Sequence, residues 1–346
     1  MHERLIEKAE NEHRLDEVEL ALLLASSAAE EPLAAAADRV RKKHVGDGVH
    51  LRGLIEFSNI CRRSCLYCGL RRENEKIERF RLPPEEIVRL ARNAKGYGYR
   101  TVVLQGGEDG FWSAAALAPV LREIRAMGLV ITLSIGERSE EEYRAFKEAG
   151  ASRFLLRIET TDRALYERLD PHMSWEARRM CLASLRRLGY EVGTGSLVGL
   201  PGQSVESLVR DILFFQEIDA DMVGIGPFIP NGDTPLGEEA AGDIHLTRRM
   251  VSLLRLLLPE ANIPATTAME TLASGARVLA LRSGANVVMP NVTEGDFRRR
   301  YALYPGKAHV RDTPEQCRAD LAAQLSQIGR FVAEDAGFRR QGSMNT

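Results

Sequence analysis

The chain has 346 residues, of which 44% are hydrophobic, enough to bury a large core. Its 47 basic and 49 acidic residues leave a formal net charge of −2, which excludes an extended cationic surface for nucleic acid. The charged N-terminus lacks the apolar run of a signal peptide, and Glu30, Glu31 and Pro32 interrupt the Ala/Leu-rich stretch 20–37, so we expect no membrane span and a cytoplasmic location.

Helical spacing of leucines predicts helices over residues 3–45. From residue 49 onward, short apolar runs alternate with amphipathic stretches, several of which end in glycine. The predicted strands are 49–58, 101–106, 130–135, 153–159, 191–198, 222–228, 263–268 and 286–290. The predicted helices between them are 84–97, 114–127, 140–149, 175–188, 205–217 and 247–258.

This alternation predicts an α/β protein with a parallel sheet, and eight repeats favour a closed (β/α)8 TIM barrel over an open doubly wound sheet. We expect N-terminal helices over 1–48 that pack on the barrel, the barrel over 49–310, and a C-terminal helix and tail over 311–346. The polar residues 331–346 are expected to be loosely held.

Three cysteines, Cys61, Cys65 and Cys68, follow the first predicted strand in a C-x3-C-x2-C pattern. In a barrel this loop lies at the carboxyl ends of the strands, where active sites form. Thiolates are strong ligands for iron, and three of them can hold a 4Fe–4S cluster whose fourth iron stays open. A zinc site, a disulfide and unrelated thiols are the alternatives, but no fourth Cys or His lies between Asn59 and Arg81 to complete a zinc site.

Further polar residues stand at predicted strand ends. Gln105-Gly106-Gly107-Glu108 follows the second strand as a ligand-binding turn or an ordinary Gly-rich turn. Arg157 and Glu159 share one strand face, where burial is costly unless they are paired or bind a ligand; an exterior ion pair is the alternative. Arg178 can bind a carboxylate through two parallel hydrogen bonds, or it can lie on a solvated helix face.

Two more candidate groups lie on the last strands. The hydroxyls of Thr266 and Thr267, on the predicted seventh strand, suit a polar substrate or simply fill the strand. Met289 packs on a ligand or in the core.

The cysteine pattern, with Tyr67 just before Cys68, resembles the signature of the radical S-adenosylmethionine (SAM) superfamily. The resemblance implies an enzyme with a 4Fe–4S cluster that reductively cleaves SAM to a 5′-deoxyadenosyl radical. It also implies a set of SAM-binding residues: Tyr67, Gln105, Gly106, Gly107, Glu108, Ser134, Glu159, Arg178, Met222 and Met289. It places Arg157, Thr266, Thr267 and Tyr301 near the substrate.

Over residues 15–307 the chain further resembles the FeFe-hydrogenase maturases, relatives of biotin synthase and methylornithine synthase. Ile55-Glu56-Phe57-Ser58-Asn59, Gly199-Leu200-Pro201-Gly202-Gln203 and Leu303-Tyr304-Pro305-Gly306-Lys307 carry this resemblance. It implies assembly of the diiron subsite of the hydrogenase H-cluster from a small organometallic or amino-acid-derived substrate, with a reductant protein and other hydrogenase maturases as partners. A radical synthase acting on an amino acid and a non-catalytic iron–sulfur carrier are the alternatives.

The chain departs from part of that family at its C-terminus. Where some members have three further cysteines for an accessory cluster, His309, Cys317 and Asp320 stand here. One thiolate cannot hold a cluster, so the sequence predicts a single 4Fe–4S cluster. Cys181, within a predicted amphipathic helix, is expected to be a buried small hydrophobe.

Overall fold

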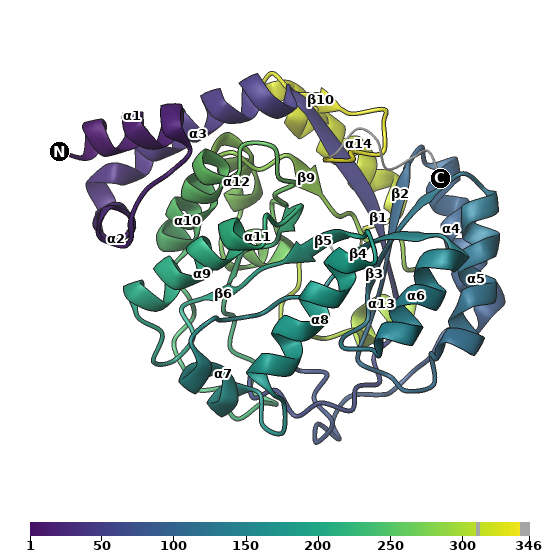
Figure 1. Cartoon of the computed structure of the whole chain (residues 1–346). Coiled ribbons are helices and arrows are strands. Elements are labelled where there is room, and N and C mark those ends of the chain that lie inside the picture. Colours follow the sequence, from purple (N-terminus) through teal and green to yellow (C-terminus); the bar gives the residue numbers. More distant parts are fainter. Residues whose placement is uncertain (309–311, 340–346) are drawn as a thin grey trace.

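A computed structural model describes residues 1–308 and 312–339 (Figure 1). The strands are β1 (Gly48–Ser58), β2 (Thr101–Gly106), β3 (Val130–Ser134), β4 (Ala151–Leu155), β5 (Glu191–Thr194), β6 (Leu197–Val198), β7 (Met222–Val223), β8 (Gly226–Pro227), β9 (Val287–Val288) and β10 (Phe331–Val332).

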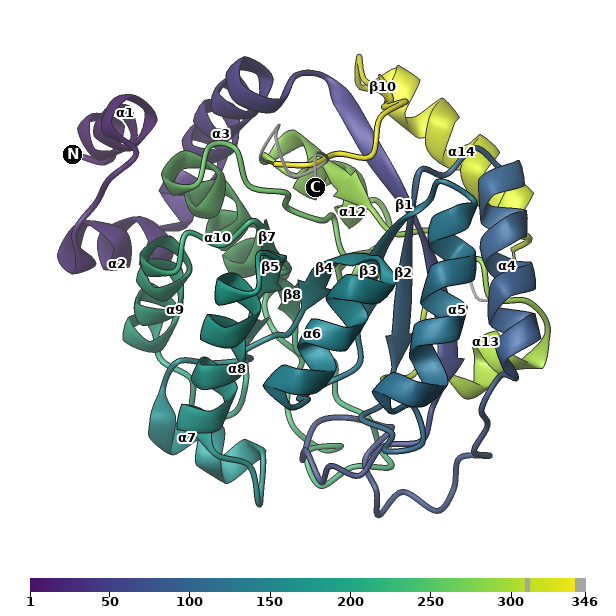
Figure 2. The ribbon, with the colours of Figure 1, turned by 45° about the vertical axis from the view of Figure 1, so that its right-hand side comes forward.

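Helices cover the outside of the sheet (Figure 2). They are α1 (His2–Glu12), α2 (Glu17–Ala25), η1 (Ser27–Ala29), α3 (Glu30–Val45), α4 (Pro84–Gly96), α5 (Ala114–Ala126), α6 (Glu140–Ala149), α7 (Arg163–Leu169), α8 (Trp175–Arg187), α9 (Val205–Glu217), α10 (Ile244–Leu257), α11 (Thr267–Leu272), α12 (Ala276–Arg282), α13 (Asp296–Arg300) and α14 (Pro314–Gln327).

The strands form a parallel ring. Pairing runs in the order β1, β2, β3, β4, β5 and β7, and β9 pairs with β1 from the other side. Two isolated bridges, Met222 with Asn262 and Pro264 with Val287, join β7 to β9 and close the ring. The predicted α/β barrel is therefore confirmed.

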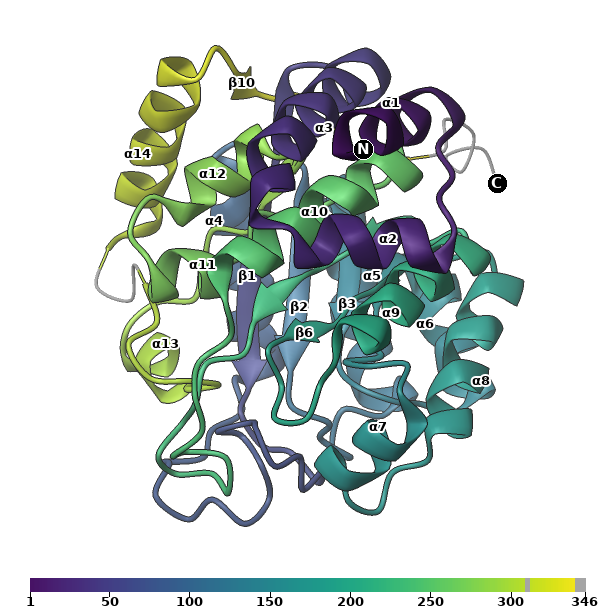
Figure 3. The same cartoon turned by 90° about the vertical axis from the view of Figure 1, so that its left-hand side faces the viewer.

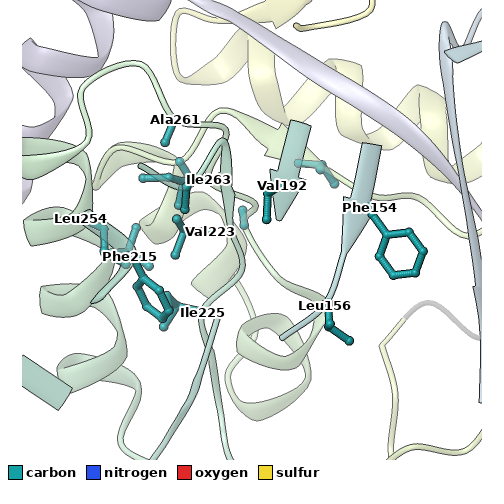
Figure 4. Packing of buried hydrophobic residues seen from close by; sticks show 14 of the residues in the cluster. Phe154, Leu156, Val192, Phe215, Val223, Ile225, Leu254, Ala261 and Ile263 are labelled. Carbon is teal, nitrogen blue, oxygen red and sulfur yellow. The ribbon is translucent and has the colours of Figure 1, made fainter. Parts of the chain in front are cut away.

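The side chains of β1 alternate between the outside and the inside of the barrel. Phe57 points outward and stacks edge-to-face on Trp112, with ring centroids 5.2 Å apart. Arg52 and Glu56 point the other way, into the barrel, because side chains alternate along a strand. Elsewhere Phe215 of α9 and Leu254 of α10 pack over Val223 and Ile225 (Figure 4).

The second half of the barrel has shorter strands than predicted. The predicted strands 191–198 and 222–228 are each interrupted, because Gly195 lies so close to Gly224 that a Cβ on Gly195 would be 1.9 Å from the Gly224 carbonyl oxygen. The predicted strand 263–268 is reduced to bridges at Asn262 and Pro264, since proline has no N–H for the ladder. The predicted strand 153–159 begins and ends earlier, as β4.

The N-terminal helices pack on α9 and α10 beside the barrel (Figure 3). Asp16 and Glu19 form a reciprocal capping box at the start of α2, which fixes where that helix begins. Among the described residues no single helix is long and apolar enough to cross a membrane. The helical segments 17–25 and 27–45 reach that length and apolarity only when they are taken together, and the chain bends by 91° between them.

The C-terminal segment differs from the expectation of a loose tail as far as residue 339. β10 pairs in parallel with the start of β1. Beyond β10, two buried guanidinium groups donate hydrogen bonds to backbone carbonyl oxygens. Arg153 donates to Ala336 at 2.9 Å, and Arg52 donates to Gly337 at 3.3 Å. The segment is held because it supplies hydrogen-bond acceptors to buried cations at the amino-terminal end of the barrel.

Candidate active site

The loop of residues 59–80, called here the cluster loop, carries the three cysteines. It follows the carboxyl end of β1, at the opposite end of the barrel from β10 (Figure 3). Arg79 braces the loop by donating hydrogen bonds to the carbonyl groups of Asn59 at 2.7 Å, Leu70 at 2.9 Å and Arg71 at 2.6 Å. A loop without regular structure is thereby held by one half-buried cation.

The thiols of this loop are held in surroundings that disfavour an isolated thiolate. Burial raises the pKa of Cys61, Cys65 and Cys68, that of Cys68 to about 12. The thiols also lie close enough for the charge of one thiolate to raise the pKa of another. Three thiolates gathered in one half-buried loop require a compensating cation, and the Glu108 N–H, 3.3 Å from Cys61 Sγ, adds a donor to one of them. This donor set fits an iron–sulfur cluster.

The number of thiols in the cluster loop matches the protein ligands of a 4Fe–4S cluster with one open iron. Nowhere in the described parts of the chain do three His, Cys, Asp or Glu side chains converge closely enough to hold one metal ion. In a 4Fe–4S cluster each cysteine ligates a different iron, so the sulfurs need not converge on one point.

Gly106 and Gly107 run directly beneath the cluster loop. The Gly107 N–H donates to the Ser58 carbonyl oxygen at 2.9 Å, and the Arg62 N–H donates to the Glu108 carbonyl oxygen at 3.0 Å. The end of β2 and the loop after β1 are thus joined by backbone hydrogen bonds.

Glu108 and Arg178 belong to one chain of buried ion pairs. Nη2 of Arg63 lies 2.6 Å from Glu108 and 2.8 Å from Glu137, and Arg178 Nε donates to Glu137 at 2.7 Å. Burial opposes ionisation of Glu108, but the hydrogen bond and charge of Arg63 prevail and lower its pKa. These linked ion pairs connect the loops after β1, β2 and β3 with α8.

Strand register brings further polar residues into one row. Glu56 of β1 pairs with Gln105 of β2, and Gln105 pairs with Ser134 of β3, so their side chains share the inner face. Gln105 is hydrogen-bonded to the phenol of Tyr301, a residue that is 2% exposed. Tyr301 is therefore close to the predicted SAM-binding residues of β2.

Arg157 and Glu159 lie side by side just beyond β4. Arg157 Nη2 is 3.2 Å from Glu159 Oε2, yet neither atom makes a well-directed hydrogen bond with a described residue. Glu159 has left-handed backbone with φ of 63°, and burial raises its pKa. Buried polar atoms without hydrogen bonds are costly, so this pair suits a polar ligand that supplies the missing partners.

Tyr67 points away from solvent toward α7. Its hydroxyl donates to Asp170 at 3.0 Å, and Asp170 also hydrogen-bonds the thiol of Cys65. Asp170 is 2% exposed, and burial raises its pKa.

The predicted residues do not all lie at this end of the barrel. Thr266 and Thr267 do: they follow the bridges at Asn262 and Pro264 and start α11 instead of extending a strand, and Thr266 Oγ1 donates to the Ile225 carbonyl oxygen at 3.1 Å. Met222 Sδ accepts from Arg52 Nη1 at 2.9 Å, level with the beginning of β2, where Arg52 pairs with Thr101.

Met289 lines a cavity between the barrel wall and α14, together with Thr267, Cys317 and Asp320. The Arg298 guanidinium lies 3.9 Å from Cys317 Sγ. His309 lies outside the described residues. Cys181 is half-buried on α8, with its thiol 4.0 Å from the Arg138 carbonyl oxygen.

Sequence reasoning gave no role to four residues at this end of the barrel whose side chains are largely shielded from solvent: Glu56, Glu137, Asp170 and Lys307. Glu56 interrupts the apolar run of β1, and Glu137 follows β3, so both could have been found as charges at strand ends. Asp170 and Lys307 lie in loops and carry no comparable signal.

Comparison with known proteins matches residues 55–215 to the model of the radical SAM superfamily. The FeFe hydrogenase maturase subunit HydE of Thermotoga maritima is 51% identical to this chain over 90% of it and 89% of the relative. The 3-methylornithine synthase of Methanosarcina barkeri is 32% identical over 94% of this chain and 93% of the relative. The crystal structure of methylornithine synthase (PylB) superimposes with a TM-score of 0.84 at 29% identity, covering 95% of this chain and 97% of that one.

Proposed function

This chain belongs to the HydE family of radical SAM enzymes, and we propose that it acts in assembly of the diiron subsite of the FeFe-hydrogenase H-cluster. The observation that carries the proposal is the three-cysteine loop above the carboxyl end of the barrel, in a chain 51% identical to a HydE. When bound, the cluster and SAM supply the electron and the carbon-centred radical that this superfamily uses.

The residues of the chain divide into three groups by position. Cys61, Cys65 and Cys68 hold the cluster, and the Glu108 N–H steadies one thiolate. The residues proposed to bind SAM are Tyr67, Gln105, Gly106, Gly107, Glu108, Ser134, Glu159 and Arg178. The residues proposed to face the substrate are Arg157, Thr266, Thr267 and Tyr301.

The barrel itself contributes exclusion of water. Ile55, Leu104 and Leu133 of β1, β2 and β3 are fully buried on the outer face of the sheet, one residue before the inward-facing row of Glu56, Gln105 and Ser134. The apolar packing between sheet and helices closes the barrel wall, so a radical formed inside it is separated from the solvent outside.

We propose that the chain holds one cluster. Cys317 is a buried thiol near the Arg298 guanidinium, and Asp320 stands where a second thiolate would be needed. A single thiolate does not match the ligand set of an accessory cluster.

The proposed partners follow from the same family. They are a small organometallic or amino-acid-derived substrate, a reductant protein, and other hydrogenase maturases. We expect the protein to work in the cytoplasm, where thiols stay reduced.

The first test is formation of 5′-deoxyadenosine from SAM by the reconstituted, reduced protein without oxygen. Wild type and Cys181→Ser, a cysteine change away from the loop, are expected to form it. Cys65→Ser is expected to form none, because the cluster loses a ligand. A wild type that binds a cluster but yields no 5′-deoxyadenosine would be a carrier, and full activity of Cys65→Ser would overturn the assignment.

A second candidate function is favoured by the 32% identity to 3-methylornithine synthase. The two functions differ in their substrate. If isotope from an amino acid, and not from an iron complex, passes to 5′-deoxyadenosine, the chain is an amino-acid radical enzyme.

A further inference from the structure

Residues 301–308, which follow α13, lie beside the cluster loop at the carboxyl end of the barrel and are called here the strap. The Leu303 carbonyl oxygen accepts from the Gly69 N–H at 2.9 Å, directly after Cys68 in the cluster loop. At its other end the Ala308 N–H donates to Thr271 Oγ1 at 2.9 Å, on α11. The strap thus joins the cluster loop to α11, which follows the strand segment next to β9.

A buried ion pair fastens the strap to the first strand. Lys307 Nζ contacts Glu56 Oε1, and the side chains are 11% and 1% exposed. Asn291 Nδ2 donates to the other carboxylate oxygen of Glu56 at 2.6 Å. Both oxygens of Glu56 are therefore occupied by groups from outside β1.

The energetics of this pair indicate a role other than stability. Removing two charges from water costs several kcal/mol per ion, and their attraction offsets that cost only with good geometry and further hydrogen bonds. An apolar pair would fill the same space without the cost. What an ion pair adds is a defined arrangement of the segment that carries it.

The group placed by this arrangement is Tyr301, at the start of the strap. Lys307 Nζ lies 5.4 Å from the centre of the Tyr301 ring. The Tyr301 phenol hydrogen-bonds Gln105 and lies near enough to Glu56, Cys61 and Cys68 to sense their charges. A shift of the strap would therefore move an aromatic wall of the cluster site.

We propose that Lys307 is a positioning residue whose ion pair with Glu56 latches the strap and holds Tyr301 against the cluster site. The proposal rests on the proposed function, since it concerns the site where cluster and SAM are expected. The latch acts through Tyr301 and the cluster loop and does not itself contact the cysteines.

Hydrogen–deuterium exchange of the cluster-free protein tests the latch without any cofactor. Lys307→Met is expected to speed exchange at the Gly69 and Ala308 amides, whose hydrogen bonds join the strap to its neighbours, by at least about tenfold. The matched control Lys8→Met breaks a Lys–Glu pair at 2.7 Å on the N-terminal helices and should leave the strap unchanged. Wild-type protection of the strap in Lys307→Met would overturn the proposal.

The EPR spectrum of the reduced protein with SAM tests positioning against a merely structural role. Lys307→Met is expected to change the spectrum, and Lys8→Met is not. In the double variant Glu56→Gln/Lys307→Met no buried charge is left uncompensated, so stability should recover but the spectrum should stay altered. A wild-type spectrum in either Lys307 variant would refute the positioning role. If wild type itself forms no 5′-deoxyadenosine, the proposed function fails, while the exchange experiment still decides the latch.

Discussion

At the scale of single residues, the cluster loop depends on a position that has no side chain. A Cβ on Gly107 would lie 2.2 Å from the Ile60 carbonyl oxygen and 2.8 Å from Cys61 Cβ. The loop after β2 therefore sets how closely the first cysteine can approach the barrel. Gly110, three residues further on, has no atom within 4 Å of such a Cβ.

This contrast gives a matched pair of variants. Gly107→Ala is expected to displace Cys61 and to lose most of the cluster, since backbone atoms cannot yield as a flexible side chain can. Gly110→Ala should reconstitute like wild type. The measurement is the visible absorbance of the cluster per chain after anaerobic reconstitution. Equal absorbance in the two variants would contradict the close packing at Gly107.

At the scale of elements, the barrel is closed unevenly. β1 to β4 pair along their length, whereas β5, β7 and β9 contribute short ladders and isolated bridges. The amino-terminal end of this barrel is completed by the C-terminal segment, which satisfies Arg52 and Arg153 and places the Phe338 ring 4.1 Å from the Arg153 guanidinium. A segment with little regular structure thus supplies contacts to the buried arginines at this end of the barrel.

Alanine substitutions at two glycines near the C-terminus distinguish the cost of backbone strain from the cost of disturbed packing. Gly337 and Gly329 have φ of 65° and 71°, but only a Cβ on Gly337 meets other atoms, at 2.6 Å from the His50 ring. Gly329→Ala is expected to cost about 1–2 kcal/mol for the left-handed backbone. Gly337→Ala should cost about 1–3 kcal/mol more, because His50 must move. Urea denaturation measures both, and equal losses would argue that the segment is not packed on β1.

At the scale of the whole molecule, the sequence predicted the barrel because each early strand is an apolar run followed by an amphipathic helix. It overestimated the later strands, since the close approach of Gly195 to Gly224 arises only in the folded protein. It singled out Cys61, Glu108 and Glu159 as candidates because they stand in spaced motifs or at strand ends. It missed Lys307, because a partner 251 residues away, Glu56, leaves no local signal.

The cluster content is a property of the whole chain. We expect iron analysis of the reconstituted protein to give about four irons per chain. Cys317→Ser should leave that number unchanged, because its thiol lies at the cavity beside α14 and not in the cluster loop. About eight irons per chain would show a second cluster and contradict the single-cluster proposal.

The C-terminal segment also sets the order in which this protein can be completed during synthesis. Arg52 of β1 donates a hydrogen bond to the carbonyl oxygen of Gly337, which lies 285 positions later in the chain. At ordinary rates of translation that interval lasts about 15–60 s. For that time a long first strand and buried cations lack their final partners, so the nascent chain resembles an aggregation-prone intermediate. We therefore expect the yield of folded protein in cells to rise when chaperones that bind the emerging barrel are co-expressed.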